Sequence, residues 1–485
     1  MPHRLHLDPH HARRWLVLAF LSVAQLLVIL DGTIVNVALP SAQADLGFSD
    51  DQRQWVITAY ALAFGSLLLL GGRLGDYFGR KWAFIIGLLG FAGASALGGA
   101  AGSFGVLVAA RGLQGVFAAL LAPAAMALVS TIFTDPVERG KAFGLFGVVG
   151  AGGGAIGLIL GGVLTEWLSW RWCLYVNLFI ALPAVFGAAS LIHNQPHPDR
   201  PPLDLAGTVT ATGGLFALVF GFSNSATDSW SAPLTIAAFA IAVVLLIANV
   251  IIESRVRFPL LPPHVVLNRA RGGSFIAIGI VGVAGFVYFL FLTYYLQGTL
   301  GLSPIQTGFA FMPLPLLIGP VGMAANVFLL RRVGPRPLIT TGLLLGMVAM
   351  VIFAQADAQS SFWGLILPGL IVVGVGMGLI FGPGLATATY GVAPTDAGVA
   401  SATANVVERI GGAVGTALVS SIFATVVASY ISSRTDTAQV AADAAVQGYH
   451  VAFYIAGGFY LVGAVLVATI MERIRFEEPV ELAVA

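Results

Sequence analysis

The chain of 485 residues is 58% hydrophobic and only 9% charged, with a mean hydropathy of +0.92 and a formal net charge of +1. Soluble globular domains are about half apolar and about 25% charged, so this composition excludes an ordinary soluble protein and a disordered one. The near-neutral charge gives no general attraction to nucleic acid, and the single cysteine, Cys173, excludes a disulfide framework and a multi-cysteine metal site.

Continuous apolar segments follow one another along the chain, and each is long enough to cross a bilayer at about 1.5 Å per residue. The fourteen segments are 15–38, 54–71, 82–101, 105–132, 142–165, 172–192, 205–224, 232–252, 273–296, 305–330, 338–355, 362–389, 398–428 and 450–471. They lack the two-residue alternation of a membrane barrel, so the sequence predicts an all-α polytopic membrane protein. The first segment is too long for a signal peptide.

The basic residues indicate the orientation of these segments. Of the 23 lysines and arginines, 18 fall on the side of the N-terminus, three on the opposite side and two within segments. Because cytoplasmic loops carry the excess of basic residues, this bias predicts that both termini lie in the cytoplasm.

An internal repeat predicts how the segments are grouped. Residues 46–49, Leu-Gly-Phe-Ser, are followed by Gln52, and residues 300–303, Leu-Gly-Leu-Ser, are followed by Gln306 at the same offset of 254. Eight segments separate the two copies, so they have the same orientation, as in a transporter made of two parallel six-helix bundles. The expected organisation is a cytoplasmic tail (1–14), an N-terminal six-helix bundle (15–192), a linker region with two extra central transmembrane helices (193–272), a C-terminal six-helix bundle (273–471) and a cytoplasmic tail (472–485).

Two charged residues lie inside the predicted spans. Asp31 lies about 10 Å from the outer end of the first span, and Arg111 lies at a similar depth in the fourth. Ionisable groups inside membranes are costly and usually face a cavity or a partner. We interpret the two as a titratable pair in a central cavity, with Asn36 and Gln114 as candidate cavity residues. The alternative is an ion pair that only fixes helix packing.

Two glycine-rich stretches predict conformational roles. The loop after the second span contains Gly72, Asp76, Gly79 and Arg80, which favours a tight cytoplasmic turn and a conformational latch. Positive-inside charge with turn glycines is the simpler alternative. The fifth span is dense in glycine from 144 to 162, which indicates close helix contacts, either for sliding or for plain packing.

The thirteenth segment contains Asn405, Glu408 and Arg409. At about ten residues into the segment, Glu408 lies near the membrane midplane and is a candidate to bind a proton or a cationic substrate. Asn405 is a further candidate cavity residue. A local pairing of Glu408 with an arginine, or a later start of the span, is the alternative.

Other motifs are absent from the sequence. It contains no H-E-x-x-H, G-x-S-x-G or G-x-x-x-x-G-K-[ST] pattern, so we expect no enzyme activity, no ATP-driven pump, no metal site and no cofactor. The N-terminal histidines and the pair His193 and His197 are weak candidates for metal binding.

Together these residues resemble the major facilitator superfamily, and within it the fourteen-helix drug:proton antiporter family. The stretch from Asp31 to Pro40 is the most specific match, and the loop 72–81 and the stretch 111–115 resemble two further motifs of the superfamily. The resemblance implies a major facilitator fold of fourteen helices in a bacterial cytoplasmic (inner) membrane. It also implies a monomeric proton-coupled antiporter that exports amphipathic or cationic drugs. In that family the acid of the first helix and the arginine of the fourth act in coupling, here Asp31 and Arg111.

The sequence departs from the family pattern at two places. The antiporter motif of the fifth helix reads Gly157, Leu158, Gly161 and Gly162, with leucine where the family carries proline. The kink that proline would impose is therefore not expected. Glu408 and Arg409 stand where relatives carry an arginine followed by glutamine.

Three functional hypotheses follow. The first is a proton-coupled exporter in which Asp31, with Glu408 as a second candidate, exchanges protons against substrate. The second is a uniporter or importer of a specific metabolite on the same fold. A membrane receptor or scaffold without transport is the third, and the costly intramembrane Asp31 and Arg111 argue against it.

Overall fold

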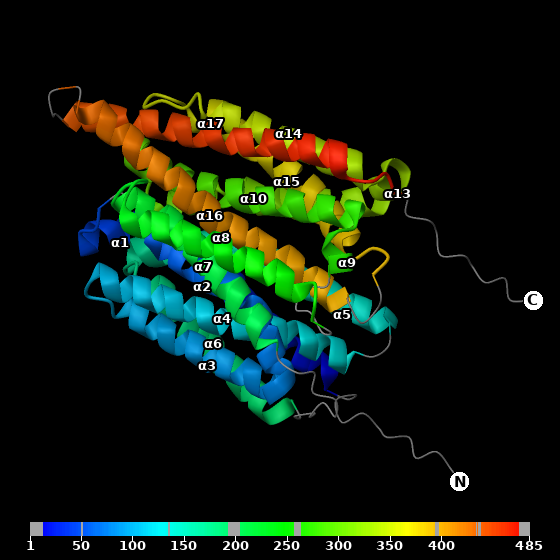
Figure 1. Cartoon of the computed structure of the whole chain (residues 1–485). Helices are drawn as coiled ribbons and strands as arrows, with labels where there is room; N and C mark the ends of the chain where they lie inside the picture. Colours follow the sequence, from blue (N-terminus) through cyan, green and yellow to red (C-terminus); the bar gives the residue numbers. More distant parts are fainter. Residues whose placement is uncertain are drawn as a thin grey trace, which may run out of the picture. The chain divides into compact units, whose positions relative to one another are not determined.

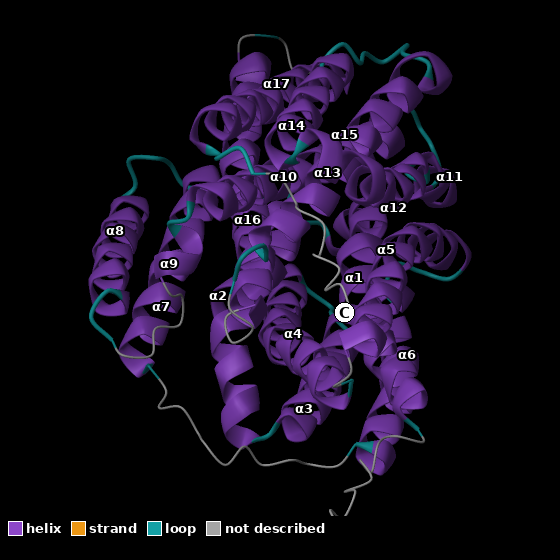
Figure 2. Cartoon of the chain, turned by 90° about the vertical axis from the view of Figure 1, so that its right-hand side faces the viewer, coloured by secondary structure: helices purple, strands orange, loops and turns teal. Residues whose placement is uncertain are grey.

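The computed structural model describes residues 13–49, 52–133, 136–192, 204–256, 263–392, 397–432, 434 and 438–474. Within these ranges every regular element is a helix (Figure 2). Twelve helical stretches are long and apolar enough to cross a membrane. This confirms the prediction of an all-α polytopic membrane fold. Helices α2 and α5 are long as well, but some of their side chains lie outside the described part, so the count of fourteen stays a prediction.

The chain divides into two compact units, whose segments can be found in Figure 1 from the residue numbers on the colour bar. The first unit comprises Met1–Leu260, Leu292–Met312 and Thr416–Thr425. Its elements are α1 (Arg14–Leu46), α2 (Gln54–Phe78), α3 (Arg80–Gly99), α4 (Phe104–Ile132), α5 (Pro136–Trp167), α6 (Trp172–Leu191), α7 (Leu205–Thr227), α8 (Pro233–Glu253), the π-helical turn η1 (Tyr295–Thr299) and α11 (Pro304–Ala310).

The second unit comprises Leu261–Phe291, Pro313–Gly415 and Val426–Ala485. Its elements are α9 (Pro263–Val266), most of α10 (Arg269–Tyr294), α12 (Pro313–Ala324), η2 (Ala325–Leu329), α13 (Leu330–Val333), α14 (Pro335–Phe353), η3 (Phe362–Ile366), α15 (Leu367–Ala388), most of α16 (Ala397–Ser432) and α17 (Ala438–Ile470).

Packing places the two extra helices with the first unit. Helix α7 packs on α8 and on α2, where Thr212 Oγ1 donates to the backbone carbonyl of Ser66 at 3.0 Å. The contacts group the helices by packing and do not test where each copy of the sequence repeat begins and ends. The boundaries at residues 192 and 272 therefore stay a prediction.

Helix α1 is longer than the apolar pattern indicates. The expected span ends at residue 38, whereas α1 continues through Pro40 to Leu46. The helix stops at Gly47, whose φ of 67° is left-handed and whose N–H donates to Gln43 O at 2.9 Å. Asp31 therefore lies about 22 Å from the end of the helix rather than about 10 Å.

The sequence repeat recurs as repeated local geometry. Gly47 and Gly301 have φ values of 67° and 68°. Gln52 Oε1 accepts from the N–H of Ser49 at 3.2 Å, and Gln306 Oε1 accepts from that of Ser303 at 2.9 Å. The repeated residues thus give the same left-handed glycine and the same contact between serine and glutamine.

The helix pairings within the two units also correspond. In the first unit α2 packs on α4, and α3 packs on α4 and α6. In the second unit α12 packs on α15, and α14 packs on α15 and α17. Helix α1 adds contacts with α5, α6 and α4, which places it among the inner helices of its unit.

Candidate functional site

Asp31 lies on α1, at the centre of the first unit. Its side chain has no exposed surface. An uncompensated buried charge costs several kcal/mol, so a buried carboxylate needs a cation and hydrogen-bond donors around it. Two neighbouring helices, α4 and α6, supply them.

Arg111 on α4 is the cation. Its Nη1 donates to Asp31 Oδ2 at 2.5 Å, and only 2% of the arginine is exposed. Its Nε donates to the backbone carbonyl of Val56 at 3.1 Å, and its guanidinium carbon lies 4.4 Å from the ring centroid of Tyr60. The guanidinium is therefore held by α1 and α2 together.

Two amides complete the shell of the carboxylate. Gln114 lies one helical turn after Arg111, so both side chains share one face of α4. Gln114 Oε1 accepts from Arg111 Nη1 at 2.8 Å, and its Nε2 donates to Asp31 Oδ1 at 2.9 Å. Asn177 on α6 donates to the same oxygen at 2.7 Å. Ser95 on α3 accepts from both amides, at 2.7 Å from Gln114 and 3.2 Å from Asn177.

The network joins α1, α3, α4 and α6 through one carboxylate. Because Asp31 is buried, its attraction to Arg111 is screened far less than at a surface. A proton on Asp31 would remove the charge that attracts Arg111 and would demand a hydrogen-bond acceptor. The site can therefore couple a change of protonation to the packing of four helices.

Sequence reasoning did not assign a role to Ser95 or Asn177. Each is a polar side chain within an otherwise apolar segment, at 82–101 and 172–192. A polar residue in such a segment indicates a side chain that forms a hydrogen bond with a polar partner inside the membrane. It does not identify the partner, which depends on how α3 and α6 pack.

Two of the three polar residues expected in a substrate cavity, Asn36 and Gln114, are hydrogen-bonded within the first unit. Gln114 is fully buried in the Asp31 network. Asn36 is 7% exposed, and its Nδ2 donates to the carbonyl of Gly32 on its own helix at 2.8 Å. Their role in binding substrate stays a prediction.

Helix α5 brings the glycines of the antiporter motif against the segment of α1 that carries Asp31. A Cβ atom on Gly157 would lie 3.0 Å from the carbonyl oxygen of Leu30, and one on Gly161 would lie 2.9 Å from that of Ile34. On the adjacent face, a Cβ on Gly162 would lie 2.6 Å from Pro304 O on α11. Leu158 is buried and sits inside an uninterrupted helix.

The loop between α2 and α3 is a tight turn at Gly79, whose φ is 101°. A Cβ on Gly72 would lie 3.6 Å from the side chain of Pro123 on α4, which is an ordinary van der Waals contact. Arg80 Nη1 donates to Thr131 Oγ1 at 2.5 Å and thereby ties the start of α3 to the end of α4. The side chain of Asp76 lies outside the described residues, and so do His193, His197 and the N-terminal histidines.

The candidate residues of the second unit lie along α16. Asn405, Glu408 and Arg409 are each partly buried. A Cβ on Gly411 would lie within 3.2 Å of the N atom of Val283, so α10 packs closely on this part of α16. Glu408 and Arg409 are adjacent in sequence and point about 100° apart on the helix. Their role in coupling stays a prediction.

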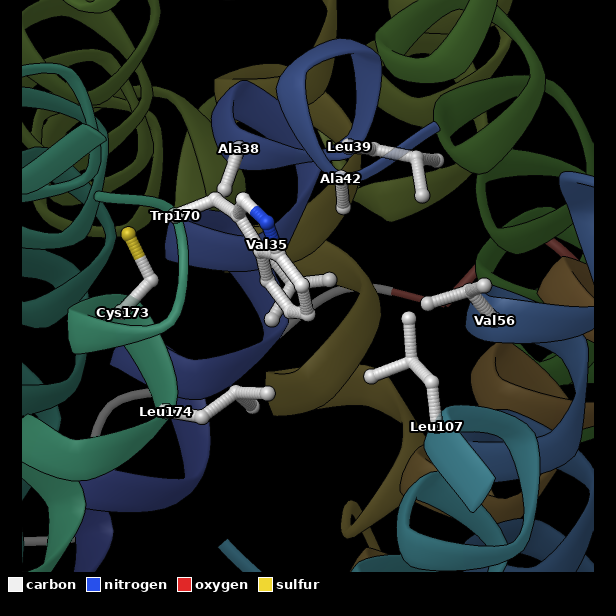
Figure 3. Close-up of a pocket in the computed structure, with 9 residues that line it drawn as sticks. All are labelled: Val35, Ala38, Leu39, Ala42, Val56, Leu107, Trp170, Cys173 and Leu174. Atoms are coloured by element: carbon white, nitrogen blue, oxygen red, sulfur yellow. The ribbon is translucent and has the colours of Figure 1, made fainter. Parts of the chain in front are cut away.

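The first unit contains a small apolar pocket (Figure 3). It is lined by Val35, Ala38, Leu39, Ala42, Val56, Leu107, Trp170, Cys173 and Leu174. Val56 also accepts a hydrogen bond from Arg111. Trp170 Nε1 donates to Asp45 Oδ2 at 3.0 Å, and this bond fixes the indole at the end of α1.

A polytopic helical protein with two repeated units and a buried ion pair belongs to the class of two-bundle membrane transporters. The chain belongs to the Major Facilitator Superfamily, whose model matches residues 21–416. It is a transporter and not an enzyme.

Several curated relatives are named for resistance to an antibiotic or for its export. The chain is 48% identical over 456 residues to the puromycin resistance protein of Streptomyces alboniger, covering 94% of this chain and 90% of the relative. It is 38% identical over 398 residues to a cephamycin export protein of Amycolatopsis lactamdurans, covering 81% and 82%.

Solved structures support the fold alone. An autoinhibited peptide transporter of the POT family matches with a TM-score of 0.69 at 17% identity, covering 96% of this chain and 99% of that one. A bacterial homologue of the human lysosomal transporter Spinster matches with a TM-score of 0.68 at 16% identity, covering 94% and 97%.

Proposed function

We propose that this transporter exports antibiotics or similar amphipathic or cationic compounds from the cytoplasm, in exchange for protons that enter the cell. The transport cycle is alternating access between the two sides of a bacterial inner membrane, with both termini in the cytoplasm. The names of the relatives support export, since one is a puromycin resistance protein and another a cephamycin export protein.

The observation that carries proton coupling is the environment of Asp31. A carboxylate with no exposed surface, bound by one guanidinium and two amides, is a group whose charge state determines the packing around it. In the proposed cycle Asp31 takes up a proton from the outer side and releases it inside. Arg111 is its counter-ion, and Glu408 is a second candidate carrier in the other unit. Protons are the coupling ion and no cofactor is needed.

The test uses the purified protein in liposomes with an imposed pH gradient and a pH-sensitive dye inside. Puromycin is added first, because the relative with 48% identity is a puromycin resistance protein, and a panel of lipophilic cations and other antibiotics follows. A change of internal pH that depends on substrate is expected, and it should vanish in Asp31→Asn.

The alternative of uniport or metabolite import gives a different result. Radiolabelled compound would then cross the membrane without any change of internal pH, and Asp31→Asn would transport at the rate of the wild type. That pair of results would contradict proton exchange at Asp31 and would make Leu158 the next residue to study.

A further inference from the structure

A site that binds a proton at Asp31 needs a hydrogen-bond acceptor for the protonated carboxyl as well as hydrogen-bond donors for the ionised carboxylate. In the structure each described contact to the Asp31 carboxylate is a donor: Arg111 at Oδ2, and Gln114 and Asn177 at Oδ1. An ionised carboxylate only accepts hydrogen bonds, so this arrangement matches the charged form. A protonated Asp31 carries one O–H, and a buried O–H without an acceptor is costly.

Asn177 carries the spare acceptor. Its Oδ1 is buried and has no hydrogen-bond partner among the described residues. The other two oxygens near the carboxylate are already engaged. Gln114 Oε1 accepts from Arg111, and Ser95 Oγ accepts from both amides.

The oxygen and the NH₂ group of the Asn177 side-chain amide are similar in size and can exchange positions. A half-turn about the terminal side-chain torsion exchanges the oxygen and the NH₂ group, and this torsion has a broad, roughly two-fold preference. In the present orientation the NH₂ group lies 2.7 Å from Asp31 Oδ1. After the half-turn the amide oxygen would occupy that position and could accept from an O–H on Oδ1. Gln114 cannot turn in the same way without losing its bond to Arg111.

We infer that Asn177 is a positioning residue that forms a hydrogen bond with both charge states of the Asp31 carboxyl. This inference rests on the proposed proton exchange at Asp31. Its NH₂ group donates to the carboxylate, and after a half-turn its carbonyl accepts from the carboxylic acid. A proton from the medium forms an O–H bond at Asp31 Oδ1, and no electrons move. The hydrogen bond between the two residues reverses direction instead of breaking.

The other groups that face Asp31 do not supply this reversal. The titratable or charged neighbours are Arg111 on α4, Tyr60 on α2, whose ring lies beside the guanidinium, and Cys173 on α6, one turn before Asn177. Helix α3 contributes the uncharged Ser95, and α5 contributes glycines. Among the side chains that contact the carboxylate in the described part of the chain, Asn177 is the one with a spare oxygen, so it can donate in one state and accept in the other without changing its charge.

The test is infrared difference spectroscopy on the wild-type protein in bilayers, comparing low with high pH. A carboxylic acid band that is lost in Asp31→Asn reports the protonation of Asp31. An amide band that is lost in Asn177→Leu reports the side chain of Asn177. We expect the two bands to change together, with the same pH midpoint, and the amide change to vanish in Asp31→Asn.

The outcomes separate this inference from the proposed function. A carboxylic acid band without any amide change would overturn the role of Asn177 and leave proton exchange standing. Absence of the carboxylic acid band in a protein that still exchanges protons for substrate would overturn the role of Asp31.

Two variants test the consequence for transport. Asn177→Leu keeps the approximate size but offers neither donor nor acceptor, so we expect substrate-dependent proton exchange to slow about tenfold or more, the effect of about one lost hydrogen bond. Asn224→Leu makes the same change on α7, outside the Asp31 network, where Asn224 Nδ2 donates to Thr235 Oγ1 at 2.9 Å, so its exchange rate should stay close to that of the wild type. Equal losses in both variants would indicate a structural role only. If Asn177→Leu does not fold, the amide change in the wild type and its loss in Asp31→Asn decide.

Discussion

Gly157 on α5 lies so close to Thr33 on α1 that a side chain at this glycine would overlap Thr33 Oγ1. The threonine cannot move aside without loss, because its hydroxyl donates to the carbonyl of Leu30 at 3.0 Å. We therefore expect Gly157→Ala to force α5 away from the segment that holds Asp31. Overpacking of this kind costs about 1–3 kcal/mol, so the midpoint of thermal unfolding should fall and proton exchange should slow.

Gly154 offers the matched control on the same helix. A Cβ at Gly154 would meet no atom within 4 Å. Alanine is the better helix former by about 0.5–1 kcal/mol, so Gly154→Ala should be neutral or stabilising. A destabilisation of equal size in the two variants would show that the contact with Thr33 is not what requires glycine.

The second prediction is that substitutions of the buried pair, Asp31 and Arg111, have non-additive effects on thermal stability. Asp31→Asn keeps the shape of the side chain and should fold and insert, yet lose proton-coupled transport. Arg111→Gln leaves the charge of Asp31 buried without a cation, which costs about 3–5 kcal/mol. Combining the two substitutions removes both charges, so the double variant should recover most of the thermal stability but not the transport.

Thermal unfolding in a fixed lipid or detergent environment measures the stabilities, and the liposome assay measures transport. The pair would lose its assigned role if the double variant were less stable than Arg111→Gln alone. Retained proton coupling in Asp31→Asn would equally contradict it.

The fold follows from the sequence because its signals are local. Apolar length marks the membrane helices, and the repeated Gly47 and Gly301 mark the same turn in both halves. The end of α1 could not be predicted in this way, since Pro40 and the polar residues after it indicate a stop that the helix passes. There the chain ends its helix at a left-handed glycine rather than at the proline.

The candidate site was only partly predictable. Asp31 and Arg111 are charges inside apolar segments, which is a strong one-dimensional signal. Asn177 and Ser95 are uncharged, and their importance depends on two further helices meeting at one carboxylate oxygen. No spacing along the chain encodes that meeting, because the residues are separated by 82 positions.

The single cysteine allows a third prediction without engineered thiols. Cys173 is fully buried, and together with Trp170 it lines the apolar pocket in Figure 3. Trp170 is 6% exposed and is fixed by its bond to Asp45. Trp170→Ala should open the pocket and raise the rate at which a small water-soluble thiol reagent labels Cys173 several-fold. Labelling is followed by mass spectrometry.

Trp167 is the control for that measurement. It is 72% exposed and does not line the pocket, so Trp167→Ala should leave the labelling rate unchanged. An unchanged rate in Trp170→Ala would mean that the indole does not limit access to the thiol.

Glu166 lies in the last turn of α5, and we predict that its carboxylate stabilises the start of α11. Its Oε2 accepts from Ser303 Oγ at 2.6 Å and from the N–H of Ile305 at 3.1 Å. Amides in the first turn of a helix have no partner within the helix, so the carboxylate satisfies one that would otherwise face solvent. Because these groups are exposed, the contact is worth about 1 kcal/mol or less.

Glu166→Ala should therefore raise the hydrogen-exchange rate of the amides at 303–307 by a few-fold, the change that about 1 kcal/mol gives when exchange follows local opening. Glu138, near the start of the same helix, forms an ion pair with Arg14 at 2.6 Å and provides the comparison. Glu138→Ala removes a carboxylate of the same kind from α5 but should leave exchange at 303–307 unchanged. Equal exchange in the wild type and Glu166→Ala would show that Glu166 does not hold α11 against α5.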